Sequence, residues 1–313
     1  MLQRRVIPDP SRPENPVVFY ASPLLESIGV PHAFSTRLGG VSRSPFDTMN
    51  LGNPNGCDIQ DPAQNLANNH ARLFSAAGLH DRPRHARVHQ VHANAVALVR
   101  PGTVHDPHAK ADALVSDDPD SVISVRVADC VPVLLSSGDG AVVAAVHAGW
   151  RGVVSDVVGA TVLTMRQLLD ESAALGPTPT LIAAIGPGIR LDAFEVGDEV
   201  VREFITAFGA EFAARITRPA APDHAAPSAT RQAPRCLQRP HIDLHEAVRL
   251  QLVRHGIAPD HIDSTDRCTF RDAREFFSHR RDRGVTGRMA ALIAPRRTPR
   301  RVPIPRSSPA SHP

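Results

Sequence analysis

The chain has 313 residues, 42% of them hydrophobic, so it is long and apolar enough to bury a substantial core. Its 4% aromatic content argues against a platform for single-stranded nucleic acid, and no apolar run approaches the roughly 20 residues that span a bilayer. The formal charge of +3 depends on five arginines near the C-terminus, so nucleic acid is not the expected partner. Four widely spaced cysteines and the lack of an apolar signal core predict a reduced, cytoplasmic protein.

The first part of the chain is predicted to combine strands with short helices. Residues 1–16 are rich in proline and arginine and are expected to be loosely ordered. A strand, a short helical turn and a second strand are expected over residues 17–34. Residues 61–77 have helical periodicity, with Asp61 as the expected N-cap and Pro62 in the first helical position.

Two valine-rich runs in the middle of the chain each end in a reactive side chain. Residues 122–127 are followed by Cys130, and residues 141–146 are followed by His147. Such β-branched runs are typical of buried strands, and catalytic groups collect where buried strands end. A glycine turn and a helix over residues 153–169 follow, and the start of that helix would favour an anion such as phosphate.

The second half of the chain is predicted to complete a single domain over residues 17–294. A proline- and alanine-rich segment, 219–240, is expected to be a flexible insertion, and residues 295–313 a disordered basic tail. The other expected elements are, in chain order, a strand at 181–185, a helix at 198–208, a helix from 242 to 255, a strand at 262–269 and a final strand at 287–293.

Cys130 and His147 could form a metal site together with one of two nearby histidines. His89 and His92 lie in residues 88–99, whose alternating pattern predicts a strand, so they would point to opposite faces. Two histidines and a cysteine with an open fourth position are typical of catalytic zinc sites, where zinc lowers the pKa of water to about 7. Two other interpretations stay open: a buried cysteine with unrelated histidines, or a metal-free nucleophilic pair of Cys130 and His147 oriented by Asp129.

Seven segments, in order along the chain, resemble the laccase-domain family. That family was once described as multicopper polyphenol oxidases; it contains purine nucleoside phosphorylases with adenosine deaminase and methylthioadenosine phosphorylase activity, and proteins named peptidoglycan editing factor. This sequence departs from the family pattern at Ala93, at Gly188 and in the long insertion. The matching segments are SxRxGGVS (35–42), QVH (90–92), ADALVS (111–116), ADCVPVLL (128–135), VAAVHAGWRG (143–152), IGPGI with FEVG (185–197), and CT with FFSHRRD and TGRMAALI (268–293).

The resemblance implies a fold and a set of metal ligands. The fold would be α/β (α+β), with layered mixed β-sheets packed between helices in a single domain. The zinc ligands would be His92, Cys130 and His147, which leaves His89 outside the set. Copper is less favoured, and laccase activity is not expected, because the chain lacks the HxH pairs that usually supply a trinuclear copper cluster.

The resemblance also implies a function. It predicts a zinc-dependent purine nucleoside phosphorylase that cleaves adenosine, inosine and guanosine with phosphate, with methylthioadenosine as a further substrate, and that also deaminates adenosine. Purine nucleosides and phosphate would be its partners, without nucleic acid or membrane, and it would be a monomer or a homodimer. Because guanidinium groups match phosphate oxygens, the candidate binding residues are Arg37, which precedes a Gly-Gly loop and would also act in catalysis, and Arg151, Arg280 and Arg281.

Alternative functions use the same cysteine and histidines. A hydrolase that edits peptidoglycan precursors would use Cys130 as a nucleophile instead of a ligand. A metal-stabilised scaffold without catalysis is a third hypothesis. Asp129 and Glu195 are conceivable proton carriers for deamination, but Asp129 could equally bind backbone N–H groups at its turn, and Glu195 could cap the next helix.

Overall fold

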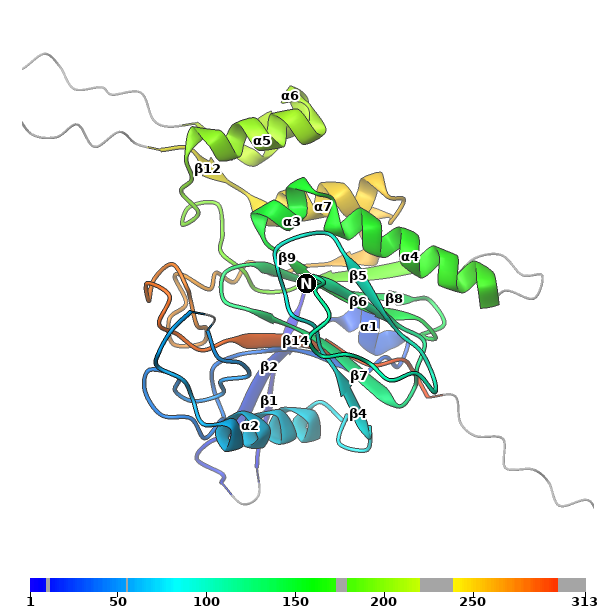
Figure 1. Cartoon of the computed structure of the whole chain (residues 1–313), viewed down its shortest axis with the longest axis vertical. Helices are drawn as coiled ribbons and strands as arrows, with labels where there is room; N and C mark the ends of the chain where they lie inside the picture. The colour runs from blue at the N-terminus through cyan, green and yellow to red at the C-terminus, as the bar shows by residue number, and fades with distance from the viewer. Residues whose placement is uncertain (10–11, 55, 173–178, 220–238, 298–313) are drawn as a thin grey trace, which may run out of the picture.

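Two six-stranded mixed β-sheets lie face to face at the centre of the protein, with helices on both outer sides (Figure 1). The computed structural model describes residues 1–9, 12–54, 56–172, 179–219 and 239–297. The layered α/β architecture implied by the resemblance is confirmed. None of the described helices combines the length and the apolar composition that a membrane crossing requires.

The first sheet consists, in spatial order, of β1 (Gln3–Ile7), β2 (Val17–Ala21), β3 (His32–Ser35), β14 (Met289–Ile293), β7 (Ser121–Val127) and β4 (Arg84–Ala86). The last strand of the chain, β14, lies in the middle of this sheet and pairs antiparallel with β3 and with β7. The sheet therefore brings the N-terminal and C-terminal parts of the domain against its central segment.

The second sheet consists, in spatial order, of β13 (Ile262–Asp263), β10 (Leu181–Ile185), β8 (Val131–Ser137), β9 (Val143–Ala148), β6 (Ala113–Ser116) and β5 (Val96–Val99). β8 and β9 form an antiparallel pair in which Pro132 lies opposite His147. Because Cys130 directly precedes β8, this pairing brings the two reactive residues of the central segment to the same edge of the sheet.

The helices are α1 (Pro23–Ser27), α2 (Ala63–Ala76), α3 (Trp150–Val154), α4 (Val157–Ser172), α5 (Asp198–Phe208), α6 (Ala210–Ile216), α7 (Leu244–Arg254) and the 3-10 helix η1 (Pro259–His261). α3, α4 and α7 cover the outer face of the second sheet, and α2 covers that of the first (Figure 1). A short ribbon of β11 (Thr217–Arg218) and β12 (His241–Ile242) follows α6.

The alternation of side chains along the strands divides the apolar core into three layers. Leu134 of β8 and Ala145 of β9 lie opposite each other and belong to the layer between the sheets. Their neighbours Val133 and Val146 pack against the helices above the second sheet. Leu73 of α2 belongs to the third layer, below the first sheet. Strands buried on both faces are apolar at nearly every position, which explains the valine-rich runs of the sequence.

Most of the predicted core elements are confirmed. The strand, turn and strand expected over residues 17–34 are β2, α1 and β3, and the strand at 181–185 is β10. The helix expected at 198–208 coincides with α5, and the helix from 242 to 255 is α7, with Asp243 as its N-cap. These elements have strong apolar patterns or a side-chain cap, which are local properties of the sequence.

The N-terminal segment is more ordered than predicted. The expectation of a loosely ordered segment is wrong for Gln3–Ile7, which pair along their whole length with β2. This strand sits at the edge of the sheet, where half of its side chains face solvent, so its polar composition does not oppose pairing. The predicted insertion lies outside the described residues from 220 to 238.

The predicted tail is also anchored at its start. The Arg296 N–H donates to the carbonyl of Gly140. Arg297 forms ion pairs with Asp81 and Asp120. Residues 298–313 lie outside the described part of the chain.

Asp61 does not cap α2. The N-cap is Pro62, and Asp61 is buried and accepts hydrogen bonds from Ser42, Asn50 and Asn65. A buried carboxylate needs several donors, and this network supplies more of them than a helix N-terminus would. The network also connects α2 to the loop that precedes it.

The helix expected over residues 153–169 is interrupted. α3 ends at Val154 and α4 begins at Val157, and between them Asp156 has a φ of 59°, in the left-handed region where a right-handed helix cannot continue. The Asp156 carboxylate accepts a hydrogen bond from the Gly159 N–H and so satisfies a free donor in the first turn of α4.

Two expected strands are mostly loops. Of residues 88–99, only Val96–Val99 form a strand, and of residues 262–269, only Ile262–Asp263 do. The backbone of His89 forms one isolated parallel β-bridge with that of Lys110. Alternation of side chains therefore overestimated strand length where no neighbouring strand was available along the whole segment.

Candidate metal centre

His147 is held by a buried carboxylate. It lies in β9, and its Nδ1 is 2.8 Å from Oδ1 of Asp112. Both side chains are buried, and the backbone N–H of His147 also donates to the carbonyl of Asp112. Because Nδ1 is occupied by the carboxylate, Nε2 is the nitrogen of His147 that is left for a ligand.

The same carboxylate shapes the turn that carries His92. Asp112 accepts hydrogen bonds from the backbone N–H groups of Val91 (3.2 Å), His92 (2.9 Å) and Ala93 (2.7 Å). His92 has a φ of 59°, a conformation that few residues adopt without such support. One buried side chain thus sets the position of two histidines.

Cys130 is positioned by the residue before it. Asp129 has a φ of 88°, and its carboxylate accepts hydrogen bonds from the Thr269 hydroxyl and from the Arg280 backbone N–H, each at 2.7 Å. The turn is therefore tied to the C-terminal part of the chain. Both carboxylate oxygens of Asp129 thus accept hydrogen bonds from residues far along the chain, and not from N–H groups of its own turn as considered from the sequence.

Gly149 leaves the space in which His92 and Cys130 meet. The Sγ of Cys130 is 3.9 Å from Nε2 of His92. A Cβ at Gly149 would lie 2.9 Å from Cδ2 of His92 and 3.0 Å from Cys130 Sγ, so a larger residue would force one of the two side chains to shift. Glycine at this position therefore allows the close approach of His92 and Cys130.

Cys130 and His147 favour each other's charged form. Burial by itself raises the pKa of the Cys130 thiol, but the charge of His147 and hydrogen bonds to both histidines outweigh burial, so the pKa is lowered. Burial lowers the pKa of His147, but Cys130 and Asp112 outweigh it, so the pKa is raised. The site stabilises a thiolate, which is the form of cysteine that binds metal or acts as a nucleophile.

The three side chains fit a metal ion. The ligand atoms of His92, Cys130 and His147 lie within 4.8 Å of one another. Two imidazole nitrogens and a thiolate are a donor set that suits zinc, and the Asp112 contact to His147 is the outer partner that metal-bound histidines normally have. The prediction that His92, and not His89, joins the other two ligands agrees with this geometry.

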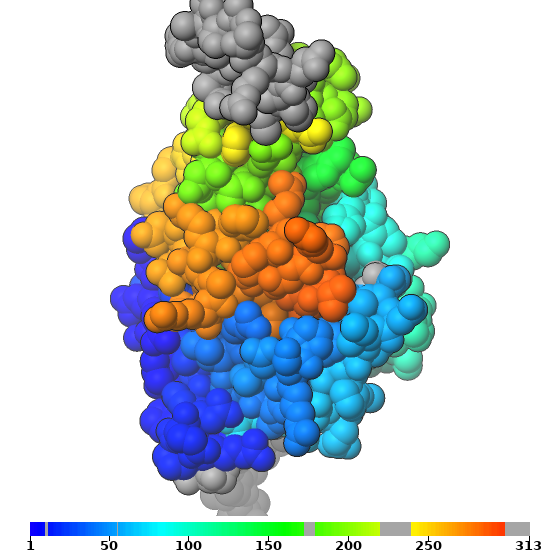
Figure 2. Space-filling view, turned by 90° about the vertical axis from the view of Figure 1, so that its left-hand side faces the viewer, coloured from blue at the N-terminus to red at the C-terminus, as the bar shows by residue number. Residues whose placement is uncertain are grey.

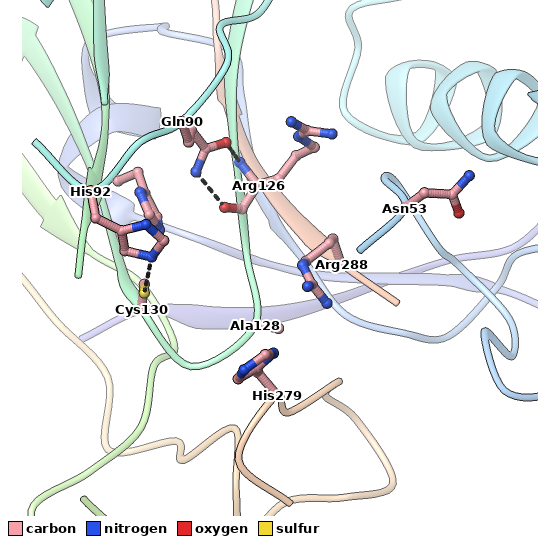
Figure 3. A pocket seen from close by; sticks show the side chains of 9 residues that line it. Asn53, Gln90, His92, Arg126, Ala128, Cys130, His279 and Arg288 are labelled. Carbon is pink, nitrogen blue, oxygen red and sulfur yellow. Dashed lines mark hydrogen bonds between the residues drawn. The ribbon is translucent and has the colours of Figure 1, made fainter. Parts of the chain in front are cut away.

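The metal ligands lie at one end of a pocket of about 260 Å³, which is formed where the two sheets meet. In Figure 3, His92 and Cys130 lie on one side, and Arg126, Arg288 and Asn53 on the other. Among the residues that the structure describes, no aspartate or glutamate lines the pocket. The lining residues are Asn53, Gln90, His92, Arg126, Ala128, Cys130, His147, His279 and Arg288.

Distant segments meet around this pocket. On the face shown in Figure 2, the segment before residue 60 (blue) and the segment around 260–290 (orange) lie side by side. The Leu51 N–H donates to the carbonyl of Arg288, and the Arg37 N–H donates to that of Glu275. These contacts place Asn53, His279 and Arg288 around one cavity, although they are far apart in the sequence.

Arg37 does not reach this pocket. Its Nε donates to the Asp47 carbonyl, its NH1 to the Ala273 carbonyl and its NH2 to the Asp47 carboxylate, and the group lies over the ring of Phe277. The guanidinium is therefore satisfied by the protein. Its glycine loop has a packing role, because a Cβ at Gly39 would lie 2.5 Å from the carbonyl oxygen of Pro16. The structure gives no support to a phosphate-binding or catalytic role for Arg37.

The other three predicted arginines also lie outside the pocket lining. Arg151 lies over the ring of Trp150, and Arg280 lies over that of Phe194 and donates to the Glu195 carbonyl. The guanidinium of Arg281 donates to the carbonyls of Thr269, Phe270 and Phe276 and pairs with Asp282. The guanidinium groups of Arg280 and Arg281 therefore hold loop segments, whereas that of Arg151 lies on the exposed surface of α3.

Glu195 neither caps α5 nor lines the pocket. The N-cap of α5 is Gly197, and the backbone of Glu195 forms an isolated antiparallel β-bridge with that of His241. The exposed imidazole of His279 is instead the pocket side chain, beyond the metal ligands, that could carry a proton.

Sequence reasoning missed Arg126, Arg288 and His279. Arg126 is the one charged residue in the apolar run 122–127, and a charge within a buried strand is a signal that could have found it. Arg288 and His279 belong to the segments TGRMAALI and FFSHRRD, where several arginines stand close together and local sequence does not rank them.

Two stacked mixed sheets with a His, Cys and His group that could hold a metal ion define an α/β protein with a candidate metal centre. Residues 31–296 match the family described as multi-copper polyphenol oxidoreductase laccase. The chain belongs to this family, as the resemblance predicted.

Relatives with assigned names cover most of the chain. The purine nucleoside phosphorylase YfiH of Shigella flexneri is 36% identical over 267 residues, which is 85% of this chain and 93% of that protein. A purine nucleoside phosphorylase of Deinococcus radiodurans is 35% identical over 280 residues, or 88% of this chain and 94% of that protein.

Solved structures share the fold. The hypothetical protein YfiH of Bacillus licheniformis superposes with a TM-score of 0.70 at 26% identity, covering 89% of this chain and 96% of that chain. The protein NMB0706 of Neisseria meningitidis superposes with a TM-score of 0.63 at 30% identity, covering 85% and 94%.

Proposed function

We propose that this chain is a zinc-dependent purine nucleoside phosphorylase acting on adenosine, inosine and guanosine, with methylthioadenosine as a further substrate. The observation that carries the proposal is that His92, Cys130 and His147 lie at the end of a pocket that also contains arginine side chains but no carboxylate. Relatives named purine nucleoside phosphorylase, similar over most of the chain, support it.

Phosphorolysis replaces a carbon–nitrogen bond with a carbon–oxygen bond. A phosphate oxygen bonds to C1′ of the ribose while the C1′–N9 bond breaks, and the bonding electron pair leaves with the purine. The proton lost by phosphate ends on the purine, and His279 is the pocket imidazole that would pass it on. Zinc, when bound, supplies a positive charge that stabilises charge developing in the substrate.

Zinc fits the ligand set better than a copper cluster does. Among the described residues, His92, Cys130 and His147 are the one group of three or more His, Cys, Asp or Glu side chains placed to hold a metal. A multicopper oxidase needs several such groups close together, and a blue-copper site would need a weak axial ligand such as methionine. We therefore do not propose laccase activity.

The same centre would support deamination of adenosine. In that reaction an oxygen from water bonds to C6 of adenine, the amino group leaves as ammonia, and a proton passes from the water to the leaving nitrogen. Histidine- and cysteine-bound zinc supports this chemistry in other deaminases, which use a glutamate to carry the proton. No glutamate lines this pocket, so we assign the proton transfer to His279.

The rival function is editing of peptidoglycan precursors. The lowered pKa of the Cys130 thiol suits a nucleophile as well as a ligand, so the site does not by itself separate the two roles. Substrate profiling separates them: a phosphorylase converts nucleosides only with phosphate, whereas an editing hydrolase acts on a muropeptide precursor without it.

The deciding experiment assays the zinc-loaded full chain with inosine and phosphate. We expect hypoxanthine and ribose-1-phosphate in equal amounts, and no product when phosphate is left out. Metal content measured on the same protein tests the zinc requirement. Activity in metal-free protein would refute the zinc mechanism, and turnover confined to a muropeptide precursor would refute the phosphorylase.

A further inference from the structure

The guanidinium group of Arg126 is unpaired within the described part of the chain. Its backbone is hydrogen-bonded, but within the described residues its guanidinium has no hydrogen bond or ion pair. Burial lowers the pKa of Arg126, and the cations Arg87 and Arg288 lower it further, while no carboxylate offsets them. A half-buried cation beside other cations is unfavourable unless an anion joins them.

Arg288 adds a second cation to the same pocket. Its NH1 donates to the carbonyls of Thr286 and Gly287, and no ion pair with a carboxylate occurs among the described residues. Burial lowers the pKa of Arg288, despite the opposing effect of Cys130, Asp129 and Cys57. Its guanidinium points into the pocket in Figure 3. The remaining donors of this group are free for a ligand.

Arg126 is held in place by the side chain of Gln90 and lies against Gly52. The Gln90 side-chain amide donates to the Arg126 carbonyl (2.8 Å), and its oxygen accepts from the Arg126 N–H (2.9 Å), which ties Arg126 to the turn of His92. A Cβ at Gly52 would lie 2.5 Å from Cδ and 3.1 Å from NH1 of Arg126. Gly52 therefore provides the space in which the Arg126 side chain lies.

We propose that Arg126 and Arg288 form a binding subsite for a phosphate-type oxyanion, with Gly52 as the positioning residue for Arg126. The inference rests on the proposed function, and within it identifies where phosphate binds. Unpaired guanidinium groups offer the planar donors that phosphate oxygens accept, and the pocket contains no carboxylate to compete for them. The subsite lies opposite the metal ligands, so phosphate and metal would act from different sides of a bound nucleoside.

Direct binding of inorganic phosphate to the zinc-loaded full chain, measured by titration calorimetry without nucleoside, tests the subsite. We expect saturable binding that weakens at least tenfold in Arg126→Gln and in Arg288→Gln, because each loses charge-assisted hydrogen bonds. Gly52→Ala should weaken phosphate binding in the same direction by displacing the Arg126 side chain. Arg249→Gln, which removes a surface charge paired with Glu246, is the matched control.

Two control measurements accompany the phosphate titration. Thermal unfolding shows that each variant is folded, and metal analysis shows that each retains zinc. Phosphate binding that is equal in wild type and Arg126→Gln would overturn the subsite, as would its absence from a wild-type protein that phosphorolyses inosine. If wild type binds phosphate through both arginines but cleaves no nucleoside, the proposed function fails and the subsite stands.

Competition with adenosine 5′-monophosphate identifies the source of the oxyanion. If phosphate binds at least as tightly as the nucleotide, the subsite binds free phosphate as a co-substrate. If the nucleotide binds more tightly than phosphate, and the two affinities become equal in Arg126→Gln and Arg288→Gln, the subsite binds the phosphate group of a substrate. Nucleotide binding that is insensitive to both substitutions contradicts the proposal.

Discussion

At the metal-ligand end of the pocket, Asp112 holds His147 and the turn of His92 through four hydrogen bonds, whereas at the other end the guanidinium of Arg126 has none among the described residues. The first end is oriented by the protein itself and suits an ion that needs a fixed geometry. The second end keeps its donors for an anion. We therefore expect substitutions at the first end to remove function outright and those at the second to weaken it in steps.

Removal of a metal ligand is expected to have the largest effect. In Cys130→Ala and His147→Ala we expect less than a tenth of the wild-type zinc and phosphorolysis reduced by roughly 1,000-fold or more, since a metal contributes several kcal/mol to transition-state stabilisation. Metal analysis and single-turnover rates measure both quantities. Cys57→Ala, at a half-buried cysteine outside the ligand group, is the control. Full activity in Cys130→Ala would contradict a role for the thiol as ligand or nucleophile.

Loss of the Asp112 charge is expected to have the next largest effect. Asp112→Asn keeps the shape of the side chain but removes its charge and replaces one of its two accepting oxygens by an NH2 donor. The contacts to His147 and to three backbone N–H groups cannot then all be kept, so zinc affinity should fall by about 10-fold to 100-fold. Competition with a chelator measures this affinity. Asp192→Asn, in an exposed ion pair with Arg271, should leave it unchanged. Equal affinity in both variants would mean that the turn is held by packing alone.

A pair of arginine substitutions compares a satisfied guanidinium with an unsatisfied one. Arg37→Gln should lower the free energy of unfolding by about 1–3 kcal/mol, because it removes three hydrogen bonds, and should change the KM for phosphate by less than twofold. Arg126→Gln should show the opposite pattern: no loss of stability and a KM for phosphate raised about tenfold. Urea unfolding and steady-state kinetics measure the two quantities, and a raised KM in Arg37→Gln alone would reverse our assignment.

The smallest expected effect tests the positive potential at the arginine end. Burial, with a smaller contribution from the charges of His70, Arg87 and Arg126, lowers the pKa of His85 to about 3. Below pH 6.5 the unfolded chain therefore binds a proton that the folded chain does not, so stability falls as the pH drops from 6.5 towards 3.

One histidine of this kind contributes up to about 1.4 kcal/mol per pH unit. We expect the free energy of unfolding, measured in urea between pH 6 and 4.5, to depend less steeply on pH in His85→Gln than in wild type. The difference in slope should correspond to at most one bound proton. His80→Gln, at an exposed histidine, provides the comparison. Identical slopes for His85→Gln and wild type would show that His85 is not held neutral.

Local sequence was sufficient for part of the site. Cys130 stands out because it follows a buried valine-rich strand, and His147 because it lies near the end of one; such strands are recognisable from composition alone. The choice of His92 over His89 came from the resemblance, and the supporting argument from strand faces was wrong, because His92 lies in a turn with a φ of 59°. That turn depends on Asp112, which is 20 residues away in sequence and could not be inferred from spacing.

The sequence by itself determined the apolar layers, most core elements and the kinds of side chain available for chemistry, because these depend on local composition and periodicity. Only the tertiary structure decided which arginines are free to bind a ligand. Arg37 is satisfied by the carbonyl of Ala273, which is 236 residues away, whereas Arg126 meets no such acceptor. A guanidinium is available for phosphate only when the folded chain leaves its donors unpaired, and that depends on contacts between segments far apart in sequence.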